Sequence, residues 1–456
     1  MTIRPIPRPL LAEMAVKALE AGIVSDIQIA GIVHPRVSSL TVAGETWIDQ
    51  SECGWTCEDT VFPSDLWDDL AREVESLGLK VGSAGFIASQ LCTRYVQIGA
   101  HGYPTAMKPK KDPRKALAQK AIRSSVFGGR QELFRTSANI NQIVVEDLSA
   151  AYVRLLSTPL PFGSGYRLDL SHVRTIHELC SDRRDTLIVG GWEVDEREPH
   201  APQPLPYRDA DGATCYPHGR WYGCYWASEA HTKCVRLVKP LAAWSFQLSP
   251  WLRILGDLLL EMRERSVFPA FWKIVGNRCA GNLAAEGPKK KVIPAEEAIA
   301  GDFPVFSDLF LRVTAPQPRS YARIPAYSAI TSRCRVMLRR AMVGRLDDLL
   351  AVHTDGMYLM RKRDIPFPKA SPTMPAVWRE KDAVEMEFGN FVGLGAGTWY
   401  AQKCGCDLPV MERRTGIAKQ LPWSEVTGGD VRLGLGDKGR EDTGEGRTKA
   451  PRVEEF

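Results

Sequence analysis

Two aspartates that follow short apolar runs constrain this chain more than any other feature. Asp147 comes just after Ile-Val-Val in NQIVVEDLSAAYVRLL, and Asp355 lies between two apolar runs in AVHTDGMYL. The first pattern predicts a strand that turns into a helix, and the second predicts a hairpin with Asp-Gly at its turn. Each aspartate alone is most often structural, as a helix N-cap or a turn residue. Together, two carboxylates at strand ends indicate a place where divalent cations can bind.

Two consecutive helices are predicted between these aspartates. The segment SPWLRILGDLLLEMRERS begins with Ser-Pro, which favours a helix start, and carries Arg263 and Arg265 near its end. In the next helix, which a proline opens, Lys273, Asn277 and Gly281 lie four residues apart and share one face. Taken alone, this face is most simply a solvated one with a packing glycine. Its charge and its small residue also suit close contact with a phosphate-bearing ligand.

The composition is that of an ordinary globular protein. The 456 residues carry a net charge of +5, which permits a polyanionic partner but does not require one. No apolar run is long enough to span a membrane, and the N-terminus lacks the pattern of a secretory signal. Eleven cysteines without an export signal predict reduced thiols in a cytoplasm. The close pairs Cys53/Cys57 and Cys404/Cys406 lack the further ligands that a zinc site needs.

Local signals predict further elements. Residues 63–77 have a capping pattern and acidic early turns, and residues 328–345 precede the second aspartate, so both are expected to be helices. The stretch 193–219 is rich in proline, glycine and aspartate, which predicts loops and short hairpins. The basic segment 108–120 reads as a linker. From residue 427 the chain has almost no apolar content, which predicts disorder.

The order of these segments, a carboxylate, a helix with lysine and a second carboxylate, resembles motifs A, B and C of family-B DNA polymerases. The similarity is greatest to the protein-primed branch found in phages and linear mobile elements, and it spans roughly residues 75–420. Motif A of the family is an aspartate followed by a tyrosine, matched by Asp147 and Tyr152. The resemblance implies that Asp147 is a metal ligand. It also implies that Tyr152 packs under the incoming sugar and rejects ribonucleotides.

Motif B of the family is matched on the second helix by Lys273, Asn277 and Gly281, with an alanine where the family has a tyrosine. The resemblance implies that Lys273 and Asn277 bind the incoming nucleotide and that Gly281 lies against DNA. Arg263 and Arg265 on the preceding helix are expected to bind the same phosphates.

Motif C of the family is Asp-Thr-Asp-Ser on a hairpin, and here it reads His-Thr-Asp-Gly. The metal-binding aspartate of the motif is matched by Asp355, while His353 replaces the first aspartate. His353 and Thr354 are expected to lie just outside the metal ligands. The implied cofactor is Mg²⁺, with Mn²⁺ as the alternative, because an imidazole ligates Mn²⁺ better than Mg²⁺.

Other segments agree with the same family. VFGGR resembles the Tyr-x-Gly-Gly element that holds the template strand, so Gly128, Gly129 and Arg130 are expected to contact DNA. GTWYAQK resembles the Lys-x-Tyr element that grips the primer, which assigns DNA contact to Tyr400. Residues 205–229 are similar to the β-rich stretch that this branch carries between motifs A and B. Valine and threonine stand where the family has the tyrosine of the first element and the lysine of the second.

The resemblance implies an α+β fold with right-hand polymerase architecture. A palm with an antiparallel sheet, helical fingers and a small thumb are expected to follow a reduced N-terminal α/β region. Relatives begin with a 3′–5′ exonuclease marked by Asp-x-Glu, and no such motif precedes Asp147, so we expect an inactive remnant without proofreading. The expected parts are 1–107, the exonuclease remnant; 108–160, the linker and palm start with motif A; 161–248, a β-rich insertion resembling the priming-protein contact region; 249–287, the fingers with motif B; 288–326, a second insertion; 327–375, the palm with motif C; 376–426, the thumb; and 427–456, the disordered tail.

The expected activity is template-directed DNA synthesis, which adds deoxynucleotides to a 3′ hydroxyl by two-metal phosphoryl transfer and is protein-primed. The implied partners are a DNA template and primer, deoxynucleoside triphosphates and a terminal priming protein, with no membrane. Two alternatives stay open. One is a catalytically degenerate scaffold for DNA binding or priming, suggested by the departures at His353, Gly356, Ala280 and Thr398. The other is an RNA-dependent enzyme or a primase, against which Tyr152 argues.

Overall fold

The structure is a computed structural model, and it divides the chain into two compact units. The first unit takes its described residues from 1–106, 152–157 and 251–323, and the second takes them from 107–151, 158–250 and 324–456. The chain therefore passes between the units several times. The structure describes residues 2–6, 39–42, 45–49, 64–82, 84–99, 120–169, 176–195, 201–209, 212–287, 290–297, 299, 303–306, 309–313, 317–362, 364, 366–369, 375, 377–395, 398–403 and 411–413.

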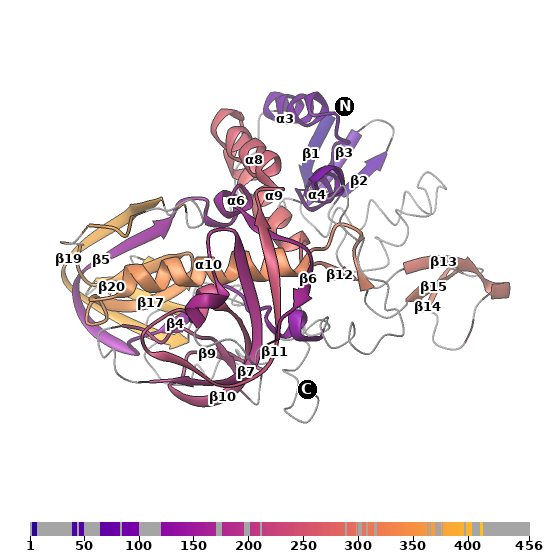
Figure 1. Cartoon of the computed structure of the whole chain (residues 1–456). Coiled ribbons are helices and arrows are strands. Elements are labelled where there is room, and N and C mark those ends of the chain that lie inside the picture. The colour runs from indigo at the N-terminus through magenta and orange to yellow at the C-terminus, as the bar shows by residue number, and fades with distance from the viewer. Residues whose placement is uncertain are drawn as a thin grey trace. The chain divides into compact units, whose positions relative to one another are not determined.

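The first unit is built around packed helices (Figure 1). Its α9 (Pro269–Asn282) packs against both α4 (Ala84–Gly99) and α8 (Arg253–Arg265). Two glycines allow α8 and α9 to approach the short helix α6 (Ala151–Leu156) closely. An added Cβ would lie 2.7 Å from the Ser157 nitrogen at Gly256, and 2.6 Å from Val153 Cγ2 at Gly276. The remaining elements are α3 (Ser64–Ser76), the sheet of β1 (Thr2–Ile6), β3 (Glu45–Asp49) and β2 (Ser39–Val42), the pair β12 (Glu286–Gly287) and β16 (Gln317–Pro318), the sheet of β13 (Lys290–Pro294), β15 (Leu309–Val313) and β14 (Phe303–Phe306), and η4 (Ala295–Glu297).

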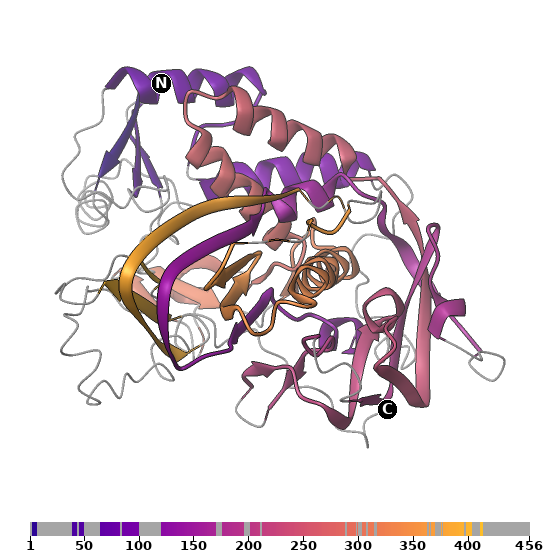
Figure 2. The same ribbon diagram turned by 90° about the vertical axis from the view of Figure 1, so that its left-hand side faces the viewer.

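The second unit contains a curled, antiparallel seven-stranded sheet (Figure 2). Its long strands bend because bulges interrupt the pairing of the two central ones, at Glu380/Asp382 and Glu385/Gly389. At Gly389 an added Cβ would lie 2.9 Å from the Ile140 carbonyl oxygen, so the bend needs glycine there. In spatial order the strands are β21 (Met411–Arg413), β20 (Thr398–Lys403), β19 (Trp378–Gly395), β5 (Ser137–Leu148), β18 (Gly356–Leu359), β17 (Leu349–Thr354) and β4 (Arg130–Leu133).

A buried helix, α10 (Ile324–Met342), packs against both sheets of this unit. One side of it, with Leu338 and Met342, joins the apolar residues of β5, β17 and β18 in one core. Its other side, at Ala329, joins a core formed by the four-stranded sheet. That sheet is antiparallel and contains β10 (Gly219–Trp226), β7 (Arg184–Val194), β11 (Val235–Ser249) and β6 (Leu160–Arg167), with η3 (Ile176–Leu179), α7 (Ala227–Ala230) and the hairpin β8 (Tyr207–Arg208) and β9 (Thr214–Cys215) beside it.

The helices predicted from local signals are present, with two corrected starts. Helix α3 and the start of α9 at Pro269 are confirmed. The predicted cap at Ser249 is wrong because β11 extends to that residue, so α8 begins at Arg253 without a side-chain cap. Helix α10 begins four residues before the predicted Ser328, because Pro325 is accommodated in its first turn.

Further predictions concern membrane spans, the cysteines, the linker and the C-terminal tail. Among the described residues, no helix is both long and apolar enough to cross a membrane. The cysteines in the described ranges are free of disulfides. The cysteine pairs Cys53/Cys57 and Cys404/Cys406, the tail from residue 427 and the linker up to residue 119 lie outside the described residues.

Candidate active site

A row of four residues crosses four neighbouring strands of the seven-stranded sheet near their ends. His353 pairs with Gly356, Gly356 pairs with Asp147, and Asp147 pairs with Arg379. Directly opposite residues in a sheet point to the same face, so these residues form one row across β17, β18, β5 and β19. Gly356 contributes no side chain, and a Cβ added there would contact Asp147 Cβ at 3.8 Å. In this row only the backbone of Gly356 therefore lies between Asp147 and His353.

The Asp147 carboxylate is held by a guanidinium. Arg379 donates from Nε to Asp147 Oδ1 over 2.8 Å and from Nη2 to Oδ2 over 3.3 Å. The aspartate side chain is 16% exposed and the arginine 48%, so this pair lies at the surface of the sheet. The hydrogen bond to Asp147, together with the charges of Asp147 and Asp355, raises the pKa of Arg379. One guanidinium thus interacts with both predicted metal-binding carboxylates.

The hairpin tip that carries Asp355 is strained. The Asp355 amide donates to the His353 carbonyl over 2.8 Å, which closes a tight turn centred on Thr354. Thr354 has a φ of 57°, a region that β-branched residues rarely occupy. Such strain persists only where surrounding structure enforces it, and it concentrates at functional sites. The predicted Asp-Gly turn is corrected here, because Thr354 and Asp355 form the loop and Gly356 already belongs to β18.

Two hydrogen bonds fix the Asp355 carboxylate and backbone beside the end of β5. Thr354 Oγ1 donates to Asp355 Oδ1 over 2.8 Å and lies 3.4 Å from His353 Nδ1. The Leu148 amide donates to the Asp355 carbonyl over 2.9 Å. Because Leu148 follows Asp147 directly, this bond ties the hairpin tip to the first aspartate. The structure therefore brings Asp147, Asp355, His353 and Thr354 together.

The six predicted nucleotide- and DNA-binding residues on the helices belong to the first unit. On α9, Lys273 and Asn277 are exposed, and open space surrounds the position of a Cβ at Gly281, so these residues form an accessible stripe. Arg265 is exposed and pairs with Glu261 at 2.6 Å, one turn earlier on α8. Arg263 on α8 and Tyr152 on α6 are half-buried.

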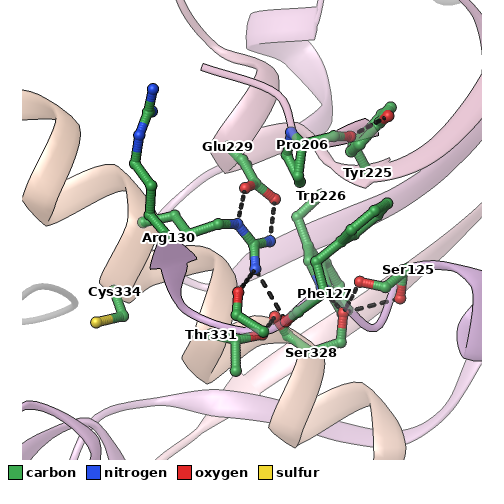
Figure 3. Close-up of polar contacts among 12 residues, drawn as sticks. Ser125, Phe127, Arg130, Pro206, Tyr225, Trp226, Glu229, Ser328, Thr331 and Cys334 are labelled. Atoms are coloured by element: carbon green, nitrogen blue, oxygen red, sulfur yellow. Dashed lines mark hydrogen bonds and ion pairs between the residues drawn. The ribbon is translucent and has the colours of Figure 1, made fainter. Parts of the chain in front are cut away.

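The segment that resembles the template-holding element is fixed from inside by α10 (Figure 3). Arg335, only 1% exposed, donates from Nη1 to the carbonyls of Phe127 and Gly128 over 3.0 and 2.9 Å. The same guanidinium forms a two-point ion pair with buried Glu229, at 2.7 and 2.9 Å. Gly128 itself is exposed, and an added Cβ would have nothing within 4 Å. The glycine backbone is thus accessible outside and anchored inside.

Two side chains predicted to contact DNA are buried. Arg130 is 1% exposed, donates to Glu132 Oε2 and to the Gln203 carbonyl over 2.6 and 2.7 Å, and lies 3.9 Å from the centre of the Tyr216 ring. Tyr400 is wholly buried. Direct contact of these two side chains with DNA does not fit this burial. Both side chains lie in the interior of the protein and not on the DNA-contacting surface that the sequence pattern predicts.

Sequence reasoning missed three residues of this region. Arg379 lies 232 positions from its partner Asp147, and Arg335 lies 106 positions from Glu229. No local spacing reveals such pairs. Arg335 also stands in the run SRCRVMLRR, which resembles a solvated basic face rather than a buried one. The only signal of burial in the sequence is that arginines alternate with apolar residues in this run. In the structure, two sheets cover the helix that contains it.

The fold is similar to that of phi29 DNA polymerase in solved structures. Phi29 DNA polymerase complexed with primer-template DNA and incoming nucleotide substrates aligns with a TM-score of 0.55 and 15% identity, over 78% of this chain and 68% of that chain. Phi29 DNA polymerase complexed with single-stranded DNA aligns with a TM-score of 0.55 and 13% identity, over 82% and 73%. No protein-family model and no curated protein matches the sequence. At this identity the likeness concerns the fold.

The strain at Thr354 generates a prediction about stability. Thr354→Gly loses the hydrogen bond to Asp355 but relieves the strain, so its free energy of unfolding should exceed that of Thr354→Val by about 0.5–1 kcal/mol, because the left-handed conformation costs a branched residue about 1–2 kcal/mol and glycine loses part of this gain to chain entropy. Urea denaturation measures the change. As a control, Thr354→Val keeps the branched side chain, loses the hydrogen bond to Asp355 and should be destabilised by about 1 kcal/mol. Equal destabilisation of both variants would show that the turn is unstrained.

Proposed function

We propose that this protein is a template-directed DNA polymerase that adds deoxynucleotides to a 3′ hydroxyl, with protein priming and without proofreading. The observation that carries the proposal is the pair of carboxylates, Asp147 near the end of β5 and Asp355 in the turn before the neighbouring β18, in a fold similar to that of phi29 DNA polymerase. In this proposal the seven-stranded sheet is the palm, and α8 and α9 are the fingers. DNA template, primer, deoxynucleotides and a priming protein are the proposed partners.

The residues present fit a magnesium site that the substrate completes. Among the described residues, no group of three or more acidic, histidine or cysteine side chains could hold a metal ion. Mg²⁺ is commonly held by only one or two carboxylates, with waters and substrate phosphates as the other ligands. Asp147 and Asp355 would hold it here, and when bound it would lower the pKa of the attacking hydroxyl and stabilise charge on the phosphate oxygens. His353 beside them gives a reason to test Mn²⁺ as well.

The chain's own residues have separate proposed tasks. Lys273, Arg263 and Arg265 neutralise the triphosphate, and Asn277 orients it through a hydrogen bond. Tyr152 packs under the sugar and selects deoxynucleotides. The Thr354 hydroxyl holds the Asp355 carboxylate in place. The carboxylate is therefore already oriented before the reaction begins. The backbones of Gly128, Gly129 and Gly281, which carry no side chain, let DNA approach closely.

A second candidate function has a specific observation in its favour. Arg379 engages both oxygens of Asp147, the atoms that a metal ion would need. A protein that had lost catalysis could keep this ion pair between Asp147 and Arg379 and serve as a DNA-binding or priming scaffold. The two functions differ in whether Asp147 and Asp355 are needed for synthesis or only for folding.

Primer extension distinguishes them. Wild-type protein with a primed template, deoxynucleotides and Mg²⁺ or Mn²⁺ should extend the primer, and Asp147→Asn or Asp355→Asn should each slow extension by at least about a hundredfold, because each removes a negative metal ligand. Asp382→Asn is the matched control, since Asp382 is an exposed aspartate of β19 outside the row, and it should behave as wild type. Absence of extension by wild-type protein that binds DNA would favour the scaffold.

The guanidinium on Asp147 predicts an effect on metal affinity. Arg379→Ala should tighten Mn²⁺ binding about two- to fivefold. In this variant Mn²⁺ no longer has to displace the arginine from the Asp147 carboxylate, and such an exposed ion pair is worth up to about 1 kcal/mol. Calorimetric titration of DNA-free protein measures this, and Arg379→Lys, which keeps the charge, should stay near wild type. Weaker Mn²⁺ binding by Arg379→Ala would mean that the arginine supports the metal site and does not compete with it.

A further inference from the structure

A cavity of about 270 Å³ lies between α10 and the chain around α7, within the second unit and formed by residues outside the catalytic row. Arg339 and Arg340 line it from α10, and His231 and Lys233 line it from the chain that follows α7. A phosphate group with its neighbouring atoms fits a space of this size. The cavity is therefore a candidate for a ligand that none of the sequence motifs assigns.

Two lining residues of this cavity, Ser228 and Glu229, are held by buried polar contacts. Glu229 lines it and is 2% exposed, fixed by the two-point ion pair with Arg335 (Figure 3). Ser228 beside it donates from its hydroxyl to Asp185 Oδ2 over 2.6 Å and from its amide to Oδ1 over 3.2 Å. A site whose lining residues are held in this way needs little rearrangement to receive a ligand.

The charges around the cavity favour an anion. Glu229 is its single acidic lining residue, and the charge of Glu229 is already balanced by Arg335. Lys233 and Arg340 are exposed and have no ion-pair partner in the part of the chain that the structure describes. Arg339 is fixed beside them by a 2.8 Å bond from Nε to the Pro202 carbonyl. Uncompensated cations converging on a hollow attract phosphate.

An aromatic pair beside the cavity indicates which source of phosphate fits best. The ring of His231, a lining residue, lies 4.9 Å from the ring of His177, with 41° between the planes. Both histidines are exposed. Exposed aromatic faces next to cationic groups are the combination with which proteins bind single-stranded nucleic acid, since bases stack on the rings while phosphates meet the cations.

We infer that this cavity binds a backbone phosphate of a single-stranded nucleic acid, with Lys233 and Arg340 as the contacting cations and His231 as a stacking surface. The inference rests on the proposed function, because the single-stranded nucleic acid is taken to be the one on which the polymerase acts. It adds a strand-binding site whose residues are separate from Asp147, Asp355 and the α9 stripe.

Fluorescence anisotropy of a labelled oligothymidylate, measured at several NaCl concentrations, tests it. Loss of the one phosphate contact reduces the slope of log K against log salt by about 0.7, so the double variant Lys233→Gln/Arg340→Gln should bind about fivefold more weakly near 0.1 M salt. His177→Ala should also weaken binding. Lys239→Gln/Lys369→Gln removes the same charge from exposed lysines outside the cavity and should keep the wild-type slope. Equal thermal unfolding midpoints check that all variants fold.

The outcomes separate this inference from the proposed polymerase activity. Primer extension by wild-type protein together with an unchanged slope in the Lys233/Arg340 variant would overturn the inference and leave the activity standing. A reduced slope in that variant, with no extension by wild type, would support the cavity and count against the polymerase. Displacement of the oligonucleotide by equimolar inorganic phosphate would overturn the inference, because it would show a site for the free anion.

Discussion

The register of β5 between β18 and β19 is the constraint on which the rest of the candidate site depends. It places Asp147 opposite Gly356 on one side and Arg379 on the other. Its neighbour Glu146 points to the opposite face, where it is 2% exposed and lies 3.5 Å from Arg345. A slip by one residue would exchange these two acids, burying the aspartate and exposing the glutamate. The apolar residues of β5 that pack on both faces of the sheet prevent that slip.

Several charged groups lie close together at one end of this sheet. Two carboxylates and one guanidinium lie at the ends of β5, β17 and β19, where the backbone leaves the apolar core. Thr354 accepts an unfavourable conformation and directs its hydroxyl to Asp355. Arg379 offsets part of the repulsion between the aspartates in the absence of metal. Stability of the metal-free protein and affinity for a cation therefore act against each other at Asp147.

Local features of the sequence were enough to predict much of this fold. The strand before Asp147, the hairpin at Asp355 and the helix opened by Pro269 all follow from spacing and turn residues. Contacts between distant segments were not accessible in this way. The arginines on Asp147 and Glu229, and the burial of Arg130 and Tyr400, depend on which strands and helices become neighbours. The burial of Arg335 in α10, which packs against two sheets, depends on the same contacts between distant segments.

Iron-mediated cleavage shows whether Asp147 and Asp355 form one metal-binding centre. Fe²⁺ bound in place of Mg²⁺, with ascorbate and peroxide, produces hydroxyl radicals that cut the backbone nearest the metal. Two cuts are expected in wild-type protein, one at the end of β5 and one at the β17–β18 turn, both suppressed by excess Mg²⁺ and lost together in Asp147→Asn. Cleavage at only one of these segments, or at neither, would show that the two aspartates do not bind one metal centre.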